Sequence, residues 1–585
     1  MRRTHTCGQL TRKEIGKKVV LQGWVDTRRD HGSIIFIDLR DRYGKTQAVF
    51  SPDHKEAHKI AQDFKREYVV EIEGTVSARK PGTEKKDWPT GEIEVVCEKA
   101  EILNVAEVPP LEIDDRVLAN EDVRLKYRYL DLRRPAMQHN LIFRHAVLQA
   151  IRKFMHDNKF LEIETPMLIR STPEGARDYI VPSRVNPGKA YSLPQSPQLY
   201  KQILMVAGMD KYFQIARCLR DEDLRADRQP EFTQLDVEMS FPEEEDIYNL
   251  GDGLMKHVFN ETMGIDLKTP FPRIPYNDAM EKYGTDKPDL RFGLELVDVT
   301  ELLKKSDFEV FKNSPFIKCL NARGCGNFSK SDLAKLTDLA KVYKAKGLVT
   351  IKIAGNKMES NVAKYISDSL QKELLKKTNA KDGDLLLMVA DNYKITNAAL
   401  AALRNWLGKK LNLYDPRDFK FCWVVYFPLF EWNEEEERWD AAHHMFTMPK
   451  KEHLKYLETD PGKVHAQCYD LVLNGIEIAS GSIRIHRWDI QEKVMKVLGL
   501  NKADAERKFG FLLEAFRYGA PPHGGFAPGI DRLVAIMLGI PGGDIREVIA
   551  FPKNKNAECP MDGCPTVPDE KTLKELNMKF TFEKK

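Results

Sequence analysis

The sequence predicts an α+β protein of several domains, and three observations support this fold class. The chain has 585 residues, more than a single hydrophobic core usually organises. Short β segments fill residues 18–103, whereas amphipathic segments with helical spacing follow them. A lysine-rich stretch at residues 292–418 then separates two regions that contain apolar strands. We therefore expect a small N-terminal barrel, a larger mixed domain, and an α/β domain inserted into it.

Residues 1–105 are expected to form a five-stranded barrel. The segments VVLQGWVDTRRD, SIIFIDLRD, TQAVF, YVVEIEGTV and IEVVCEKAEIL are separated by turn signals. This pattern favours the nucleic-acid-binding barrel known as the OB-fold, although a generic small barrel has the same pattern. The first two strands carry cationic and aromatic side chains, namely Arg28, Arg29, Phe36 and Arg40. Such a mixture can stack on a single-stranded base and hold phosphates.

A hinge at residues 106–135 follows, first rich in proline and charge and then helical in pattern. The next segment, LIFRHAVLQAIRKFMHDNKF, has apolar residues at helical spacing and should bury one face. EIETPML then resembles a strand that ends at Pro166, because proline cannot donate a hydrogen bond to a neighbouring strand. We assign residues 136–291 to the first part of the larger domain.

Residues 292–418 are expected to form an inserted domain, because the segments on either side supply complementary parts of one site. The inserted stretch itself carries no obvious catalytic cluster. Apolar strands return in residues 419–555, where FCWVVYFPLF and YDLVLNGIEIASGSIRI precede a glycine-rich loop that opens a helix. Residues 556–585 are expected to be a C-terminal extension that wraps loosely over the surface.

The overall composition excludes several protein classes. Apolar residues make up 42% of the chain and charged residues 31%, and no apolar run is long enough to span a membrane. The first residues also lack the apolar stretch of a signal peptide, so we expect a cytoplasmic protein without membrane contact. The formal charge of +3 does not indicate a nucleic-acid partner, so any such surface must be local.

The nine cysteines are scattered through the chain, which favours reduced thiols over a disulfide framework. Cys559 and Cys564 form the one close pair, in CPMDGC. Two thiolates are half of a tetrahedral zinc site, and no second pair lies near them in the sequence. The sequence therefore leaves open whether this pair binds a metal.

The stretch from Tyr212 to Phe241 concentrates charge between two apolar strands, and its loop carries Arg220, Arg225 and Arg228. A guanidinium group donates through a bidentate fork that suits phosphate, so this loop is expected to clamp a polyanion. A solvated charged hairpin is the alternative. The position of RDE and EF at the strand ends, where side chains are held in place, disfavours that alternative.

A glycine-rich segment, HGGFAPGIDRLVAIMLG, spans residues 523–539. Gly524, Gly525 and Gly529 allow backbone to pass close to a ligand, and an amphipathic helix with Arg532 one turn in follows. The segment is not a P-loop, because the Gly-Lys-Ser/Thr ending is absent, and it lacks the G-x-G-x-x-G spacing of dinucleotide-binding folds. Alone it is weak evidence, because glycines before a helix also form plain turns.

Together these elements resemble the three signature motifs of class II aminoacyl-tRNA synthetases, which implies a catalytic domain built on an antiparallel sheet. The class I signatures, His-x-Gly-His and Lys-Met-Ser-Lys-Ser, are absent. The barrel is similar to that of the aspartate, asparagine and lysine enzymes. STPEGARDYIVPSR, QSPQLYKQ, RDEDLRADRQPEFTQLD, HHMFT, NGIEIASGSIRIH and GIDR resemble the bacterial aspartyl-tRNA synthetases over nearly the full length. The insertion resembles a module that these enzymes share with an amidotransferase subunit.

The resemblance implies that the chain activates aspartate with ATP and Mg²⁺ and esterifies it to a tRNA through aspartyl-adenylate. The residues expected at aspartate are Glu174, Ser196, Gln198, Lys201, Arg220, Asp236, His443 and Arg484. Those expected at ATP are Arg220, Asp221, Glu222, Gln229, Phe232, Glu477, Gly529, Ile530, Asp531 and Arg532. Among these residues, catalysis is expected to depend on Arg220, Glu222 and Arg532.

Individual roles follow from the same resemblance. Arg484 and Lys201 are expected to hold the side-chain carboxylate of aspartate, and His443 to close over the substrate. Arg220 would contact the α-phosphate of ATP and Arg532 the γ-phosphate, while Phe232 stacks on adenine. Asp470 and Glu477, interpreted as lying on one strand, are expected to bind Mg²⁺, although a solvated strand face is the alternative.

The resemblance also assigns the barrel to the anticodon, with Arg28, Phe36 and Gln47 as the expected contacts. His31 stands where enzymes restricted to their own tRNA have leucine, and Gly82-Thr83 lies in the second region linked to this difference. We therefore expect both tRNA(Asp) and tRNA(Asn) as partners, with strict tRNA(Asp) specificity as the alternative.

Two further alternatives are an asparaginyl-tRNA ligase and a tRNA-binding protein that has lost catalysis. The insertion and the Gln-Ser-Pro-Gln…Lys201 arrangement disfavour the first, and the presence of the motif arginines disfavours the second. The proline-ended motif forms a subunit interface in this class. Phe160 to Pro166 is therefore expected to form a homodimer interface.

Overall fold

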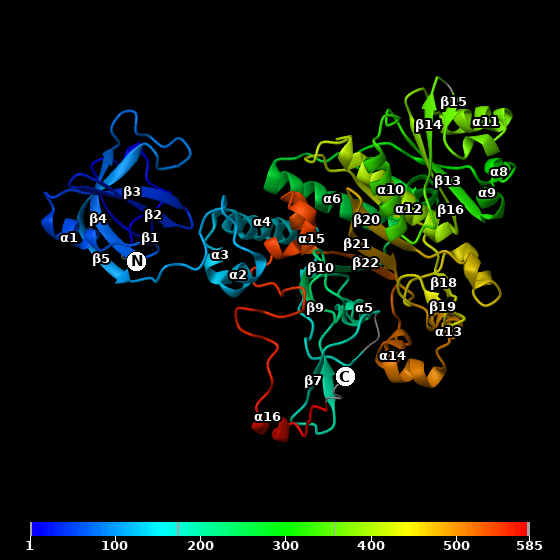
Figure 1. The fold of residues 1–585 in the computed structure, drawn as a ribbon. Helices are drawn as coiled ribbons and strands as arrows, with labels where there is room; N and C mark the ends of the chain where they lie inside the picture. The colour runs from blue at the N-terminus through cyan, green and yellow to red at the C-terminus, as the bar shows by residue number, and fades with distance from the viewer. Residues whose placement is uncertain (1–2, 172–174, 356, 582–585) are drawn as a thin grey trace. The chain divides into compact units, whose positions relative to one another are not determined.

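The computed structural model describes residues 3–171, 175–355 and 357–581, which form two compact units. The first unit contains Met1–Ile142 and Ile549–Thr566, and the second contains Phe143–Val548 and Val567–Lys585 (Figure 1). None of the helices in these described stretches combines the length and hydrophobicity needed to cross a bilayer.

The first unit contains a closed barrel whose strands follow the order β1-β2-β3-β5-β4. The strands are β1 (Lys18–His31), β2 (Ile34–Asp41), β3 (Gly44–Phe50), β4 (Val69–Ala78) and β5 (Ile93–Asn104). Alternate residues of β1 turn inward, because successive side chains on a strand point to opposite faces. Helix α1 (Lys55–Gln62) adds buried alanines, and Phe50 packs edge-on against Phe64 in the same core. The predicted five-stranded barrel is thus confirmed.

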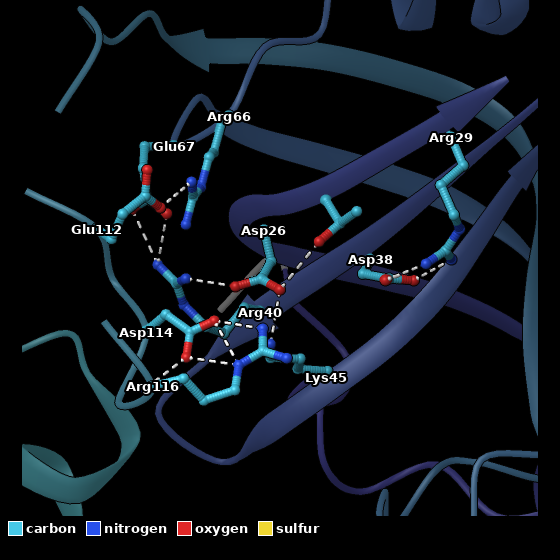
Figure 2. A network of polar contacts seen from close by, with 11 residues as sticks. Asp26, Arg29, Asp38, Arg40, Lys45, Arg66, Glu67, Glu112, Asp114 and Arg116 are labelled. Carbon is cyan, nitrogen blue, oxygen red and sulfur yellow. Dashed lines mark hydrogen bonds and ion pairs between the residues drawn. The ribbon is translucent and has the colours of Figure 1, made fainter. Parts of the chain in front are cut away.

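Arg40 stands at the centre of a buried polar network on this barrel (Figure 2). Its guanidinium donates to Asp26 at 2.6 Å and to Glu67 at 2.9 Å, and Arg133 also donates to Glu67 at 2.8 Å. The sequence interpretation of Arg40 as a phosphate-binding residue is therefore wrong, since two carboxylates already neutralise this cation inside the protein. Its role is to pair carboxylates that could not otherwise be buried.

A short helical segment follows the barrel in the same unit. It comprises α2 (Glu121–Lys126), α3 (Arg128–Asp131) and the start of α4 (Pro135–Asp157). Asp131 is fully buried and receives hydrogen bonds from Arg124, Arg128 and Arg134. Arg128 also donates to the carbonyls of Ile549 and Ala550, so this segment holds a late part of the chain.

The second unit is organised around an eight-stranded sheet of order β11-β17-β20-β21-β22-β10-β9-β6. The strands are β6 (Leu161–Glu162), β9 (Lys211–Leu219), β10 (Glu231–Ser240), β11 (Arg273–Pro275), β17 (Phe421–Val425), β20 (Cys468–Leu473), β21 (Ile476–Ile483) and β22 (His523–Pro528). Its six central strands are antiparallel, and only β11 and β6 pair in parallel at the two edges. The strand predicted to end at Pro166 is only two residues long and stops at Glu162.

The helices of this sheet domain are α5 (Gln198–Val206), α6 (Glu244–Met263), α7 (Tyr276–Tyr283), α13 (Trp488–Val497), α14 (Lys502–Phe516) and α15 (Ile530–Met537). Two small hairpins accompany them, β7 (Ile180–Pro182) with β8 (Ala190–Ser192) and β18 (Phe430–Asn433) with β19 (Arg438–Ala441). Helix α16 (Glu570–Glu575) lies near the end of the described chain.

The inserted region has its own five-stranded sheet of order β12-β13-β16-β14-β15. Its strands are β12 (Leu296–Asp298), β13 (Phe316–Ala322), β14 (Val349–Ala354), β15 (Lys357–Glu359) and β16 (Leu385–Asp391). Helices α10 (Lys330–Val342) and α12 (Tyr393–Lys410) lie on one side of it, and α8 (Thr300–Leu303), α9 (Glu309–Asn313) and α11 (Asp368–Thr378) lie on the other (Figure 1). Both faces are buried, so Leu385 and Leu387 join one core while Leu386 and Met388 join the other.

Two buried cations join the insertion to its neighbours in the second unit. Arg404 on α12 donates to the carbonyls of Asp289, Phe292 and Gly293 at 2.9 Å each and to that of Leu294 at 3.1 Å. Burial lowers the pKa of this guanidinium to about 10, which leaves it charged at neutral pH. Lys318 on β13 similarly donates to the carbonyls of residues 280 and 281. These contacts satisfy carbonyl groups on α7 and in the segment through which the chain enters the insertion.

We predict that Gly525→Ala destabilises the protein by about 1–3 kcal/mol, the range for overpacked interiors. An added Cβ would lie 1.9 Å from the carbonyl oxygen of Val237 and 2.5 Å from Glu238 Oε2, so β22 and β10 would have to separate. Gly510 on α14 has nothing within 4 Å of an added Cβ, so Gly510→Ala should instead gain about 0.5–1 kcal/mol from helix propensity. Urea unfolding of both variants tests this pair of expectations, and equal midpoints would contradict them.

Candidate functional site

A cavity of about 750 Å³ opens on the eight-stranded sheet and gathers most of the residues predicted at aspartate and ATP. Those that line it are Ser196, Gln198, Lys201, Arg220, Glu222, Gln229, Phe232, Asp236, His443, Glu477, Arg484, Gly529, Asp531 and Arg532. They come from segments up to 336 positions apart, from Ser196 to Arg532, so the fold creates this site. Glu174 lies outside the described residues.

Three cavity-lining residues, Lys201, Asp236 and Arg484, form a cluster of buried charges with Glu238, which does not itself line the cavity. Lys201 on α5 contacts Asp236 at 2.6 Å and Glu238 at 3.2 Å, and Arg484 donates through Nε to Glu238 at 3.0 Å. Burial alone would raise the pKa of Glu238, but Arg484 and Lys201 lower it, so this carboxylate is ionised. Two cations thus face two anions at a site from which water is largely excluded, and each charge fixes the position of its neighbours.

Glu238 was missed by the sequence interpretation, although it is the residue that joins Lys201 to Arg484. Asp236 and Glu238 are two positions apart on β10, so they share one face of the strand. This spacing is the signal that could have identified Glu238, because two carboxylates on a buried face need cationic partners.

Arginines line the part of the cavity next to the loop between β9 and β10. The guanidinium of Arg220 lies 5.0 Å from the ring centroid of Phe232. Arg532 donates to the carbonyl of Glu477 at 2.7 Å and contacts Asp227 at 3.3 Å, whereas Arg228 pairs with Glu222 at 3.0 Å. These guanidinium groups can bind an anionic ligand if they give up their present partners. Ion pairs near the surface are weak, so this exchange costs little free energy.

Three of the predicted ATP residues, Ile530, Asp531 and Asp221, have other contacts or positions, although Asp531 also lines the main cavity. Ile530 is fully buried in the core. Asp531 accepts a hydrogen bond from the backbone N–H of Thr233 at 2.7 Å, which fastens α15 to β10. Asp221 does not line the main cavity and instead borders a second cavity of about 550 Å³ together with Arg177 and Arg507. The side chains of Ile530 and Asp531 therefore make contacts that stabilise the fold.

Asp470 and Glu477 do not share one strand, so that part of the sequence interpretation is wrong. Asp470 is on β20 and Glu477 on β21, because the chain turns at Asn474 and Gly475, both with positive φ. Burial and the neighbouring Asp470 raise the pKa of Glu477, so the two carboxylates do sense each other across the hairpin. Lys287, which the sequence interpretation also missed, contacts Glu477 at 3.2 Å.

Two adjacent histidines of the cavity wall have opposite electrostatic surroundings. His443 Nε2 lies 3.6 Å from Asp470 Oδ2, and against the effect of burial Cys468 and Asp470 raise the pKa of this imidazole. His444 accepts a hydrogen bond from the N–H of Phe446 at 3.3 Å. Burial and the nearby cations lower the pKa of His444, so it is neutral at physiological pH.

The residues predicted at the anticodon lie on the barrel of the first unit. Phe36 contacts His31 edge-on, with 5.7 Å between the ring centroids. Gln47 is buried and donates to Glu94 at 2.7 Å, whereas Arg28 is engaged with Asp30 and with backbone carbonyls. Gly82 and Thr83 are exposed in the turn at residues 80–83.

We predict that His444→Asn reduces the loss of stability at mildly acidic pH. Burial and the neighbouring Arg484 and Lys201 lower the pKa of His444 from 6.5 to about 3. Between these values the unfolded chain binds a proton that the folded chain excludes, so wild-type stability falls as pH drops below 6.5. Asparagine offers an acceptor near the Nδ1 position and does not titrate. Urea midpoints at about pH 7.5 and about pH 5 should therefore differ less in the variant, and equal losses would contradict the assignment.

Two family models match the chain. The model described as tRNA synthetases class II (D, K and N) matches residues 120–555, and the model described as OB-fold nucleic acid binding domain matches residues 19–103. The second match coincides with the closed barrel, and the first includes the eight-stranded sheet and its cavity.

Curated relatives match along the whole chain. The aspartate–tRNA ligase of Ruminiclostridium cellulolyticum is 51% identical, with 100% of this chain and 99% of the relative covered. Proteins named aspartate–tRNA(Asp/Asn) ligase from Caldanaerobacter subterraneus and Treponema denticola are each 52% identical, with 99% of this chain and 98% and 99% of those proteins covered.

Solved structures share the fold at lower identity. The asparaginyl-tRNA synthetase from Pyrococcus horikoshii in complex with asparaginyl-adenylate has a TM-score of 0.60 and 21% identity, with 94% of this chain and 98% of that chain covered. A likeness at this identity concerns the fold alone. The family model over residues 120–555 and the full-length relatives show that this chain belongs to the class II tRNA synthetases of the aspartate, lysine and asparagine group.

Proposed function

We propose that this protein ligates L-aspartate to the 3′ end of tRNA(Asp), and also to that of tRNA(Asn), by way of aspartyl-adenylate. The observation that carries the proposal is the four-charge cluster of Lys201, Asp236, Glu238 and Arg484. All of its members except the fully buried Glu238 line a cavity that Arg220 and Arg532 also line. Full-length relatives named aspartate–tRNA ligase and aspartate–tRNA(Asp/Asn) ligase support it.

The charges of this cluster suit aspartate, which carries two carboxylates and an ammonium group. Arg484 and Lys201 would attract the side-chain carboxylate, because a guanidinium and an ammonium in a poorly solvated site bind an anion strongly. Asp236, with Ser196 and Gln198 beside it, would receive the ammonium group. Asparagine would offer Arg484 and Lys201 a neutral amide in place of a charged carboxylate, so the pocket should prefer the acid to the amide.

In the first step, a carboxylate oxygen of aspartate attacks the α-phosphorus of ATP and pyrophosphate leaves. No side chain has to act as a nucleophile. Arg220 would stabilise the charge that develops on the α-phosphate, Arg532 would hold the γ-phosphate, and Phe232 would stack on adenine. Glu222 and Gln229 would complete the nucleotide pocket. In the second step, a ribose hydroxyl at the tRNA 3′ end attacks the adenylate carbonyl and AMP leaves.

Asp470 and Glu477 would hold Mg²⁺. Asp470 is buried, and its Oδ1 has no hydrogen-bond partner among the described residues, which fits an oxygen reserved for a ligand. Burial and the neighbouring Asp470 also raise the pKa of Glu477, and a divalent cation beside these two carboxylates would favour the ionised form of Glu477. Bound Mg²⁺ supplies charge neutralisation of the ATP phosphates. Lys287 now contacts Glu477 and would have to share or yield that carboxylate.

The expected homodimer would use the region around β6. Leu161, Met167 and Leu168 expose 52%, 42% and 51% of their surface, although large apolar side chains are usually buried. A second copy of the chain would cover them in a two-fold interface.

Three alternatives remain distinct from this proposal. Strict specificity for tRNA(Asp) would leave the aspartate chemistry unchanged. An asparaginyl-tRNA ligase would need a pocket that accepts an amide, which two cations disfavour. A binding protein without catalysis would not need to retain both Arg220 and Arg532 in the cavity.

We predict that Arg484→Leu lowers kcat/KM for aspartate in ATP–pyrophosphate exchange by about 100-fold or more, because removing one partner of a buried charge pair costs several kcal/mol. Arg484→Lys keeps the charge without the bidentate fork and should be intermediate. Arg487→Lys, a surface control paired with Asp489, should behave as wild type.

ATP–pyrophosphate exchange, measured separately with aspartate, asparagine and lysine, identifies the amino acid that the protein activates. Wild-type kcat/KM in Arg484→Leu would contradict the assignment.

We predict that wild-type protein aspartylates both tRNA(Asp) and tRNA(Asn) transcripts, and that His31→Leu lowers the kcat/KM ratio of tRNA(Asn) to tRNA(Asp) about 10-fold, the effect of losing one recognition contact. His31 packs on Phe36, so its replacement alters the surface next to the proposed stacking ring. His54→Leu, on the same barrel, is the control. If the wild-type protein does not aspartylate tRNA(Asn), the proposed relaxed specificity is contradicted and strict specificity for tRNA(Asp) is supported.

A further inference from the structure

Cys468 lines the main cavity but has no part in the proposed reaction. It lies two residues before Asp470 on β20, so both side chains emerge on the same face of this strand. His443 approaches that face from a different segment, with Nε2 at 3.6 Å from Asp470 Oδ2. The ligand atoms of these three residues all lie within 4.8 Å of one another.

We propose that His443, Cys468 and Asp470 form a binding site for a thiophilic divalent cation of the Zn²⁺ type. An imidazole, a thiolate and a carboxylate are the three ligand types that Zn²⁺ takes in proteins. With metal–ligand bonds of about 2.0–2.3 Å, the edges of a tetrahedral site measure about 3.3–3.8 Å, and an edge between nitrogen and oxygen ligands lies near the lower end of this range. The 3.6 Å between the histidine nitrogen and the aspartate oxygen is within about 0.3 Å of such an edge. Three protein ligands leave the fourth position open to the cavity.

The chemistry of this group separates it from the proposed Mg²⁺ site. Mg²⁺ prefers hard oxygen ligands and would be held by Asp470 with Glu477, whereas the sulfur and nitrogen of Cys468 and His443 select a softer ion. Asp470 belongs to both groups, so the two cations would compete for it. Because the thiolate is the form of cysteine that binds a metal, a bound cation would displace the proton of the Cys468 thiol.

The functional consequence rests on the proposed function. His443 is expected to close over aspartate, and a cation bound to it would hold the imidazole on β20 instead. The bound ion would therefore oppose aspartate binding and deprive Mg²⁺ of one carboxylate. We expect Zn²⁺ to raise the apparent KM for aspartate in ATP–pyrophosphate exchange.

A second group of this kind, Cys559, Asp562 and Cys564, occurs in the described part of the chain and must be removed from the test. The parent for all measurements is therefore full-length protein carrying C559S and C564S. The probe is Co²⁺ alone, which reports thiolate ligation by a charge-transfer absorption band. The added variants are Cys468→Ser and His443→Ala, and the control is Cys422→Ser, at a buried cysteine on β17 outside both groups.

We expect the parent and its Cys422→Ser variant to bind one equivalent of Co²⁺ with the thiolate band. The Cys468→Ser variant should lose the band, and His443→Ala should bind about 100-fold more weakly, since even indirect partners of a metal contribute 10–100-fold. Excess L-aspartate should weaken the band. If circular dichroism shows that Cys468→Ser does not fold, the Co²⁺ affinity of His443→Ala alone tests the proposal.

The proposal is overturned if the parent shows no thiolate band, or if the band survives in both variants at unchanged affinity. These measurements use no ATP or tRNA, so a failure of the proposed ligase activity would appear separately as absence of aspartate-dependent exchange. Zn²⁺ competition with aspartate is measured only after such exchange has been observed.

Discussion

The buried charge cluster of Lys201, Asp236, Glu238 and Arg484 constrains the rest of the catalytic sheet. A charge inside a protein costs several kcal/mol unless an opposite charge neutralises it, so these four side chains must meet. They can meet only if α5, β10 and the chain after β21 are held in one register. Glycine at position 525 serves this requirement, because any side chain there would strike both the backbone of β10 and Glu238 itself. Packing and electrostatics therefore select the same sheet geometry.

Buried cations also stabilise the junction between the insertion and this sheet domain. Arg404 satisfies four carbonyl groups at residues 289–294, where the chain passes from one domain to the other. Lys318 satisfies two more on α7. The insertion otherwise relies on its own two cores, one on each face of its sheet. Among the described residues of 292–418, none lines the catalytic cavity, so the insertion is held in place without contributing to that cavity from this part of the chain.

The sequence predicted the features that depend on local pattern and on long motifs. Alternation and turn signals were sufficient for the barrel, and the charged loop after Arg220 and the glycines before Arg532 indicated the cavity. What it could not supply was the identity of contacts between distant segments. Arg40 looked like a phosphate ligand because its carboxylate partners, Asp26 and Glu67, are remote in sequence. Asp470 and Glu477 were placed on one strand although Asn474-Gly475, a dipeptide typical of tight hairpin turns, stands between them. Glu238 was missed because its cations come from two other elements.

The order of strands in the eight-stranded sheet has a consequence for how the molecule is made. Strand β10, at residues 231–240, pairs with β22, at residues 523–528, so the sheet cannot be completed until most of the chain has been synthesised. The barrel and the insertion contain pairings that are closer in sequence, and such local contacts form faster. On the ribosome these two modules can fold while the edge of β10 that later pairs with β22 is still unpaired. Translation speed through residues 241–528 thus sets how long an unpaired, aggregation-prone strand is exposed.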